Sequence, residues 1–368
     1  MGSGPGALRR CARSAGRQAH PIGAPSSVPP PPGWQREAEG VKRQRQPAAI
    51  AVEGLVKRFG PVTAVAGISF TVGPQEIFGF LGPNGAGKTT TIKILATLLQ
   101  PTAGVARIGG RDVTRERERV REAIGMVFQD TTLDDRLTAE ENLLFHGMLY
   151  GLSAAEVRRR AAPLMELVGL ADRARSLVRT YSGGMKRRLE LVRGLLHRPT
   201  VLFLDEPTVG LDPQTRAQIW EHVRTLSAEQ GVTVFVTTHY MEEAEHCHRI
   251  AIMDHGRIVA LDTPDGLKRQ VGGEVLALEL DHEEVRPRAV AALAGAPVTG
   301  DGCVVRAAVT DAARWLPRVA AALDRHLVRV EIHRPTLDDV FLALTGRQIR
   351  EETASAREQW AWRGRRFS

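Results

Sequence analysis

The sequence predicts an α/β fold built on a parallel sheet, followed by a small C-terminal α+β domain. Three observations support this prediction. A glycine-rich loop at 82–89 lies between an apolar run and a helix-like segment, the run 201–204 is apolar at every position, and residues after 272 alternate between apolar and polar. Strands that are apolar throughout are typical of parallel sheets buried on both faces, whereas alternation indicates a half-buried strand.

The glycine-rich loop has the composition of a phosphate-binding loop. It follows the apolar run 77–81 and ends in Lys88-Thr89, so it is a P-loop in the strand–loop–helix context that this motif requires. Successive N–H groups and the helix N-terminus would point at one phosphate, Lys88 would reach the β- and γ-phosphates, and Thr89 would ligate Mg²⁺. The predicted nucleotide contacts here are Gly82, Pro83, Asn84, Gly85, Ala86, Gly87, Lys88, Thr89 and Thr90.

Two carboxylates follow the apolar run 201–204. Asp205 and Glu206 would lie at the carboxyl end of a strand, where ligands bind in open α/β sheets. Asp205 fits a role in holding Mg²⁺, and Glu206 fits a role in polarising the attacking water. An apolar strand followed by Asp-Glu is common by itself, but downstream of a P-loop the catalytic interpretation is favoured.

Further motifs appear in a fixed order along the chain. Gln129 follows an apolar run, Ser182 opens a predicted helix, Asp212 precedes Pro213, and His239 follows the predicted strand 232–236. Each has a structural interpretation by itself: Ser182 and Asp212 can cap helices, and a histidine can simply end a strand. Taken together over about residues 48–270, the set resembles the nucleotide-binding domain of ABC transporters.

That resemblance implies a P-loop NTPase with a RecA-like core, an antiparallel β subdomain and a helical subdomain, which uses ATP and Mg²⁺. It implies that Phe59 stacks on adenine, although tyrosine is more usual there. Gln129 would contact Mg²⁺ and couple to the membrane partner, and His239 would bond the γ-phosphate, so that the catalytic set is Glu206, His239 and Gln129. The residues expected to contact a nucleotide held mainly by the opposite subunit, or to lie at the dimer interface, are Ser182, Gly183, Gly184 and Asp212. Met185 stands where the family often has glutamine.

The sequence predicts four regions. Residues 1–47 would be a disordered, basic, proline-rich tail, 48–272 the nucleotide-binding domain, 273–346 the α+β accessory domain, and 347–368 a flexible tail. Within the second region, 49–75 suit the antiparallel subdomain. Capping boxes beginning at Thr138 and Ser153 predict that 130–180 is helical, and Thr336 with Asp339 could cap a last helix. The ending Leu337 to Gly346, together with Ser182 to Glu190, resembles the ATPases of daunorubicin/doxorubicin resistance exporters.

Composition sets further limits. The net charge of +8 is concentrated in the first 47 residues, which hold eight basic and two acidic residues. No apolar run approaches the roughly 20 residues that span a bilayer, so a transporter of this kind would need a separate membrane subunit. Three scattered cysteines favour a reducing compartment.

The functional prediction is an ATP-hydrolysing subunit of a multi-component exporter for a drug-like or lipid-like substrate. It would act as a head-to-tail homodimer beneath an integral-membrane permease, peripheral to the cytoplasmic side of a bacterial membrane and without a nucleic-acid partner. The alternative is a soluble, non-transport ABC ATPase acting on nucleic acid or ribosomes. Such proteins usually carry two cassettes or long coiled-coil insertions, and this sequence shows neither. A binding-only regulator is disfavoured because Glu206 and His239 are intact.

Overall fold

A computed structural model describes residues 48–300 and 302–346 of the 368-residue chain. The segments 1–47 and 347–368, which the sequence predicts to be tails, lie outside the described residues. The chain divides into two compact units. We call residues 48–271 with 335–346 the core unit, and residues 272–300 with 302–334 the inserted unit.

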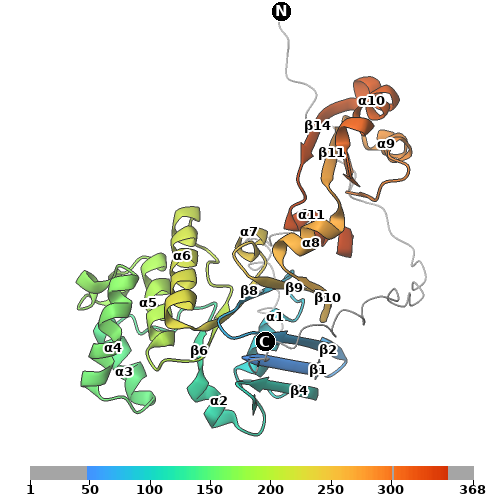
Figure 1. Cartoon of the computed structure of the whole chain (residues 1–368). Coiled ribbons are helices and arrows are strands. Elements are labelled where there is room, and N and C mark those ends of the chain that lie inside the picture. The colour runs from blue at the N-terminus through green and yellow to red at the C-terminus, as the bar shows by residue number, and fades with distance from the viewer. Residues whose placement is uncertain (1–47, 301, 347–368) are drawn as a thin grey trace, which may run out of the picture. The chain divides into compact units, whose positions relative to one another are not determined.

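The core unit holds two sheets and their covering helices (Figure 1). The first sheet has the order β2-β1-β4-β5 and is antiparallel, as predicted for 49–75; its strands are β1 (Ile50–Phe59), β2 (Val62–Val72), β4 (Ala103–Ile108) and β5 (Arg111–Asp112). The second has the order β10-β9-β3-β8-β7-β6, parallel except for β10; its strands are β3 (Ile77–Leu81), β6 (Ile124–Val127), β7 (Val201–Asp205), β8 (Thr233–Thr238), β9 (Arg249–Asp254) and β10 (Arg257–Asp262). The predicted α/β class is therefore confirmed.

Hydrophobic clusters on the two faces of the parallel sheet explain why its central strands are apolar throughout. Alternate side chains of β3 and β7 enter different clusters: Leu202 and Leu204 face one, and Phe203 faces the other. The second cluster contains tilted and stacked rings of Phe70, Phe78, Phe80, Phe203 and Phe235. Burial on both faces fixes the register of these strands, so their carboxyl ends meet at one edge.

The helices of the core unit begin where the sequence offers caps. They are α1 (Lys88–Leu95), α2 (Arg117–Ala123), α3 (Ala139–Leu149), α4 (Ala154–Leu167), α5 (Gly183–Leu195), α6 (Pro213–Gln230), α7 (Met241–Ala244), α8 (Pro264–Val271) and α11 (Leu337–Thr345). Thr138 and Glu141 form the predicted capping box of α3. The box predicted at Ser153 is only half formed. Ser153 accepts from the N–H of Glu156, but the Glu156 carboxylate binds Arg159 and Arg160 and leaves no reciprocal bond to the cap. Within the described residues, no helix is both long and apolar enough to cross a membrane.

The inserted unit is a small α+β fold with the element order βαββαβ. It contains β11 (Glu274–Leu280), α9 (Arg286–Ala292), β12 (Val298–Thr299), β13 (Val304–Val309), α10 (Ala312–Leu323) and β14 (Leu327–His333). Its antiparallel sheet has the order β12-β13-β11-β14. Its own core includes Leu276, Leu278, Val305, Ala307 and Val319.

The last helix corrects the predicted boundary at 273–346. Helix α11 packs against α8, and Leu337, Val340 and Phe341 join the main cluster of the core unit together with Leu267. Thr336 and Asp339 form the predicted capping box. The α+β fold therefore ends near residue 334, and the chain then returns to the core unit.

Candidate nucleotide site

The P-loop shapes a cavity at the N-terminus of α1. The cavity has a volume of about 290 Å³ and is lined by Ala64, Asn84, Gly85, Gly87, Lys88, Thr89, Thr90, Gln129 and Glu206. Gly87 has φ +106°, and a Cβ there would come within 2.3 Å of the Ala64 carbonyl oxygen. Only glycine therefore fits where the loop turns into the helix.

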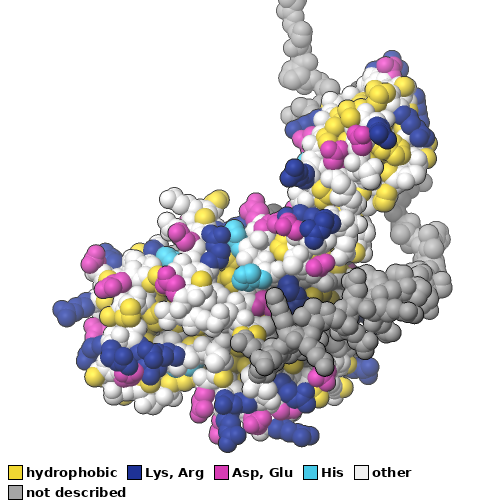
Figure 2. Space-filling model, viewed as in Figure 1, with side chains coloured by type: hydrophobic (Ala, Val, Ile, Leu, Met, Phe, Trp, Pro, Cys, Tyr) yellow, Lys and Arg dark blue, Asp and Glu magenta, His cyan; other side chains and the backbone are white. Residues whose placement is uncertain are grey.

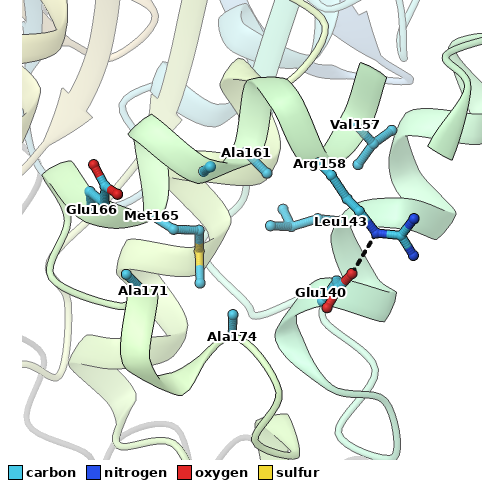
Figure 3. Close-up of a pocket in the computed structure, with 10 residues that line it drawn as sticks. Glu140, Leu143, Val157, Arg158, Ala161, Met165, Glu166, Ala171 and Ala174 are labelled. Carbon is cyan, nitrogen blue, oxygen red and sulfur yellow. Dashed lines mark hydrogen bonds and ion pairs between the residues drawn. The ribbon is translucent and has the colours of Figure 1, made fainter. Parts of the chain in front are cut away.

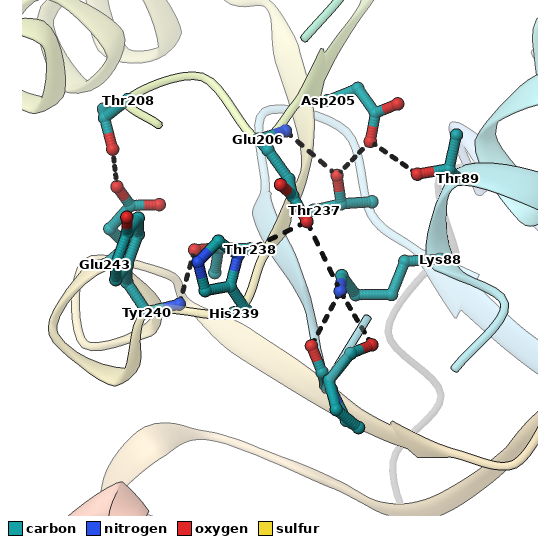
Figure 4. A network of polar contacts seen from close by, with 12 residues as sticks. Lys88, Thr89, Asp205, Glu206, Thr208, Thr237, Thr238, His239, Tyr240 and Glu243 are labelled. Atoms are coloured by element: carbon teal, nitrogen blue, oxygen red, sulfur yellow. Dashed lines mark hydrogen bonds and ion pairs between the residues drawn. The ribbon is translucent and has the colours of Figure 1, made fainter. Parts of the chain in front are cut away.

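Lys88 lies at the centre of the site and is 4% exposed. Its Nζ donates to the carbonyl oxygens of Gly82 at 2.7 Å and Pro83 at 3.1 Å, and it lies 3.5 Å from Glu206 Oε1 (Figure 4). Burial lowers the pKa of Lys88, and the charge of Glu206 opposes that shift. Gly82 and Pro83 thus position the lysine, whereas Asn84 and Gly85 line the cavity itself.

The predicted carboxylates lie at the carboxyl end of β7, directly beside the P-loop helix. Asp205 Oδ1 accepts from the Thr89 hydroxyl at 3.3 Å and from the Thr237 hydroxyl at 2.5 Å (Figure 4). Burial raises the pKa of Asp205, and the hydrogen bonds of Thr237 and Thr89 act against that rise. Carboxylate and hydroxyl oxygens are the ligands that Mg²⁺ prefers, so this pair suits a magnesium site.

Glu206 stands one residue beyond β7 in a left-handed backbone conformation, with φ +46°. Its N–H donates to both the carbonyl and the hydroxyl oxygen of Thr237, each at 3.1 Å, which holds that conformation in place. His239 Nδ1 lies 3.3 Å from Glu206 Oε1. Burial favours the protonated acid, but the His239 contact and the Lys88 charge outweigh it, and the pKa of Glu206 falls below its ordinary value. Glu206 is therefore an ionised base at neutral pH.

Two residues that sequence reasoning missed hold this site together. Thr237, at the end of β8, joins Asp205 to the backbone of Glu206. Arg187, on α5, is 6% exposed and donates to the carbonyl oxygens of Phe128, Asp205, Glu206 and Pro207. Arg187 thus connects the helix that Ser182 caps with the carboxylates and with the residue before Gln129.

The comparisons with known proteins agree with this geometry. The family model described as "ABC transporter" matches residues 65–209. "Daunorubicin resistance ATP-binding protein DrrA3" of Streptomyces coeruleorubidus is 44% identical over 82% of this chain and 98% of its own length. The chain belongs to the ABC transporter family. It is an ATP-binding and ATP-hydrolysing subunit of that family, as predicted.

Other ABC transporter relatives extend the comparison. "Linearmycin resistance ATP-binding protein LnrL" of Bacillus subtilis is 38% identical over 82% of this chain and all of its own length. "Nod factor export ATP-binding protein I" of Paraburkholderia xenovorans is 41% identical over 83% of this chain and 99% of its own. The solved cassette MJ0796, in a dimeric post-hydrolysis state bound to ADP and Pi, has a TM-score of 0.53 and 28% identity, covering 58% of this chain and 98% of that one.

The predicted signature of this ABC subunit lies on a different surface from its P-loop cavity. Ser182 caps α5 and Asp212 caps α6, and both residues are exposed. Gly184 lets the two helix starts approach, because a Cβ there would come within 2.4 Å of Thr215. The structure therefore brings Ser182, Gly183, Gly184 and Asp212 together, but none of them lines the cavity.

Phe59 also lies outside the cavity lining. It ends β1, is 49% exposed, and has Lys57 Nζ 4.9 Å from its ring centroid. Its predicted contact with adenine remains a prediction.

A second cavity of about 210 Å³ lies in the helical segment, between α3, α4 and the turn at Ala171–Arg173 (Figure 3). Its apolar lining includes Leu143, Val157 and Met165, and an ion pair of 2.7 Å joins Arg158 to Glu140 at its rim. It contains none of the predicted site residues.

Proposed function

We propose that this ABC ATPase powers the efflux of a drug-like or lipid-like substrate through a separate integral-membrane permease. The names of its relatives support the proposal, because they describe resistance to daunorubicin and linearmycin and export of Nod factor. The chain would then act peripherally, on the cytoplasmic side of a bacterial membrane. The observation that carries the catalytic part of the proposal is a connected set beside the P-loop cavity, in which Glu206 contacts Lys88 and His239 directly and Asp205 through Thr237.

We infer that Thr89, Asp205 and Gln129 would hold Mg²⁺. Thr89 and Asp205 already place oxygens 3.3 Å apart, and Gln129 lines the P-loop cavity together with Thr89. The bound ion would neutralise charge on the β- and γ-phosphate oxygens. In this arrangement Lys88 exchanges its bonds to the loop carbonyls for bonds to phosphate, while the P-loop N–H groups bind the remaining oxygens.

Glu206 and His239 would carry out the hydrolytic step. The ionised Glu206 carboxylate orients and polarises the attacking water, and His239 donates to the γ-phosphate from the adjacent position. Both residues approach the cavity from the ends of neighbouring parallel strands, so that closure around the phosphates requires little rearrangement of the sheet.

We infer a head-to-tail homodimer because the phosphate-contacting residues lie on two surfaces. Ser182 and Gly183 are exposed at the start of α5 and do not line the P-loop cavity. A second copy would bring its α5 N-terminus to the phosphates held by the first, and anions bind well at such an N-terminus. Arg187 would then transmit this contact to Glu206 and toward Gln129.

The test compares Glu206→Gln with Glu229→Gln, an exposed position at the end of α6. The first variant is expected to bind ATP and dimerise in its presence but to lose ATPase activity by about 10²–10⁴-fold, because the amide keeps the shape without the base. The control is expected to match the wild type. ATPase activity of Glu206→Gln within about threefold of the wild type would refute the assignment. Loaded membrane vesicles containing the permease then test efflux with the same pair.

A further inference from the structure

The inserted unit presents one sheet edge that is long and incompletely protected. Strand β14 lies at the end of the sheet and, among the described residues, pairs only with β11, whereas the opposite edge strand, β12, has two residues. Val328 and Ile332 of β14 are 61% and 45% exposed. Long edge strands with exposed apolar side chains readily pair with another strand. Around β11 and β14, Figure 2 shows hydrophobic side chains next to charged ones of both signs.

The backbone of β14 is oriented for such pairing. The N–H of Leu280 donates to the Cys303 carbonyl, on the β13 side of β11. The main-chain N–H and C=O groups of successive residues in a strand point alternately to its two sides. Those of Leu276 and Leu278 therefore also point toward β13. Their partners on β14 are Ile332 and Val330, which therefore direct their N–H and C=O groups away from β11 and toward the open edge. The register shifts opposite Val328, so the regular stretch begins at Arg329.

The charges on this stretch favour a second copy as the partner, in the register where Arg329 of one copy meets Glu331 of the other. Arg329 and Glu331 lie on the same face, 2.5 Å apart, with side chains that are 65% and 50% exposed. An edge guarded by charges of one sign repels a second copy, but this edge carries both signs. If two β14 strands pair antiparallel about a two-fold axis at Val330, Arg329 of each copy lies opposite Glu331 of the other. Axes at Arg329 or Glu331 would instead place like charges opposite each other, which destabilises a strand pair.

We propose that the β14 edge pairs with β14 of a second copy of this chain, in the register centred on Val330, to form a continuous eight-stranded sheet. Val330 pairs with itself through two main-chain hydrogen bonds, and Val328 and Ile332 are covered at the two ends of the contact. This inference extends the proposed homodimer, but its contact involves none of the nucleotide-site residues and does not require ATP.

The test uses full-length chains without nucleotide, with association measured by sedimentation equilibrium. Arg329→Glu gives an all-acidic edge and Glu331→Arg an all-basic one, so each variant alone should associate at least about tenfold more weakly than the wild type. An equimolar mixture of the two variants restores opposite charges at every position and should associate as tightly as the wild type. Arg306→Glu, on the interior strand β13, is the matched control and should have no effect.

A second measurement reports the register. In the proposed pairing, Arg329 and Glu331 of the partner are a non-hydrogen-bonded pair with Cα atoms about 4.5 Å apart, within disulfide range. A mixture of Arg329→Cys and Glu331→Cys chains should form a 329–331 disulfide, identified by peptide mass spectrometry. A dimer of two Arg329→Cys chains should not form a 329–329 disulfide, nor a dimer of two Glu331→Cys chains a 331–331 disulfide. In each case the introduced cysteines of the two copies would be offset by two residues along the paired strands.

The two experiments also separate this proposal from the nucleotide-dependent dimer. A wild-type chain that is monomeric without nucleotide at about 100 μM, or a mixture that associates no better than its components, would overturn the β14 pairing. Association that appears only with membranes containing the permease would assign the edge to a different partner and would equally overturn it. Neither result would alter ATP-dependent dimerisation of the Glu206→Gln variant.

Discussion

Thr237→Val removes the hydroxyl that joins the two carboxylate residues while nearly preserving side-chain shape. The hydroxyl makes two contacts, a 2.5 Å bond to Asp205 and a 3.1 Å bond from the N–H of Glu206. The second costs little to lose because the same N–H also donates to the Thr237 carbonyl. The first is a bond to an ionised group that is 3% exposed, and such bonds contribute about 1.5–3 kcal/mol. We expect the free energy of unfolding to fall by that amount at neutral pH.

The stability lost in Thr237→Val should depend on pH. Burial already raises the pKa of Asp205, and removing Thr237 as a donor raises it further, because the bond stabilises the charged form. A raised carboxyl pKa makes the folded state bind more protons than the unfolded chain, so stability falls as pH rises through that range. The variant should therefore differ from the wild type more at pH 7 than at acid pH.

Urea unfolding at several pH values measures the effect of Thr237→Val, and Thr237→Ser is the control that retains the hydroxyl. The serine variant should retain most of the stability that Thr237→Val loses, and its stability should depend on pH as that of the wild type does. If Thr237→Val unfolds within about 0.5 kcal/mol of the wild type at neutral pH, the hydroxyl does not stabilise ionised Asp205 and the reasoning fails.

Three further substitutions test other parts of the structure. Arg187→Met removes the 3.0 Å ion pair of the buried Glu190, which keeps the Thr132 N–H at 2.9 Å and the weaker contact to Arg193 at 3.9 Å, and should lower stability by about 3–5 kcal/mol in urea unfolding; an unchanged midpoint would show that Arg187 does not hold the carbonyl cluster. Phe341→Ala removes a buried ring of α11 and should cost about 3–5 kcal/mol, whereas Leu344→Ala, half-exposed on the same helix, should cost far less; equal effects would place α11 outside the core. Phe59→Ala should weaken ATP binding by about 1–3 kcal/mol if the ring stacks on adenine, with Phe59→Tyr nearly neutral, as measured with a fluorescent ATP analogue; unchanged affinity would place the base elsewhere.

The parts of the site that the sequence predicted are those in which chemistry demands a residue type at a fixed spacing. The P-loop needs glycines, lysine and a hydroxyl in order, and the carboxylates must end a buried strand. Thr237 escaped notice because threonine is ordinary in a β-strand, where its branched side chain packs well. Arg187 escaped because arginine is usually exposed, and nothing local shows that this one is enclosed by backbone carbonyls.

The fold was predictable to the same extent and for a similar reason. Cap residues predicted several helices, including α11, and apolar patterns predicted the strands. An apolar pattern reports that a face of the element is buried. It does not report which hydrophobic core that face joins. The sequence therefore could not show that Leu337 and Phe341 pack in the same cluster as Leu267, from which the whole α+β unit separates them along the chain. The half-formed box at Ser153 has a comparable cause, since the two arginines that capture Glu156 outcompete the cap.

The return of α11 to α8 affects the order in which this protein can be completed during synthesis. The ribosome makes the core unit's last helix only after the whole inserted unit, so the main hydrophobic cluster lacks Val340 and Phe341 until that unit has emerged. A nascent chain that ends near residue 334 would thus contain the whole α+β unit but lack α11, so the apolar side chains of α8 against which α11 packs would be exposed to solvent. A stop codon placed after residue 334 but before α11 would leave the chain in that state.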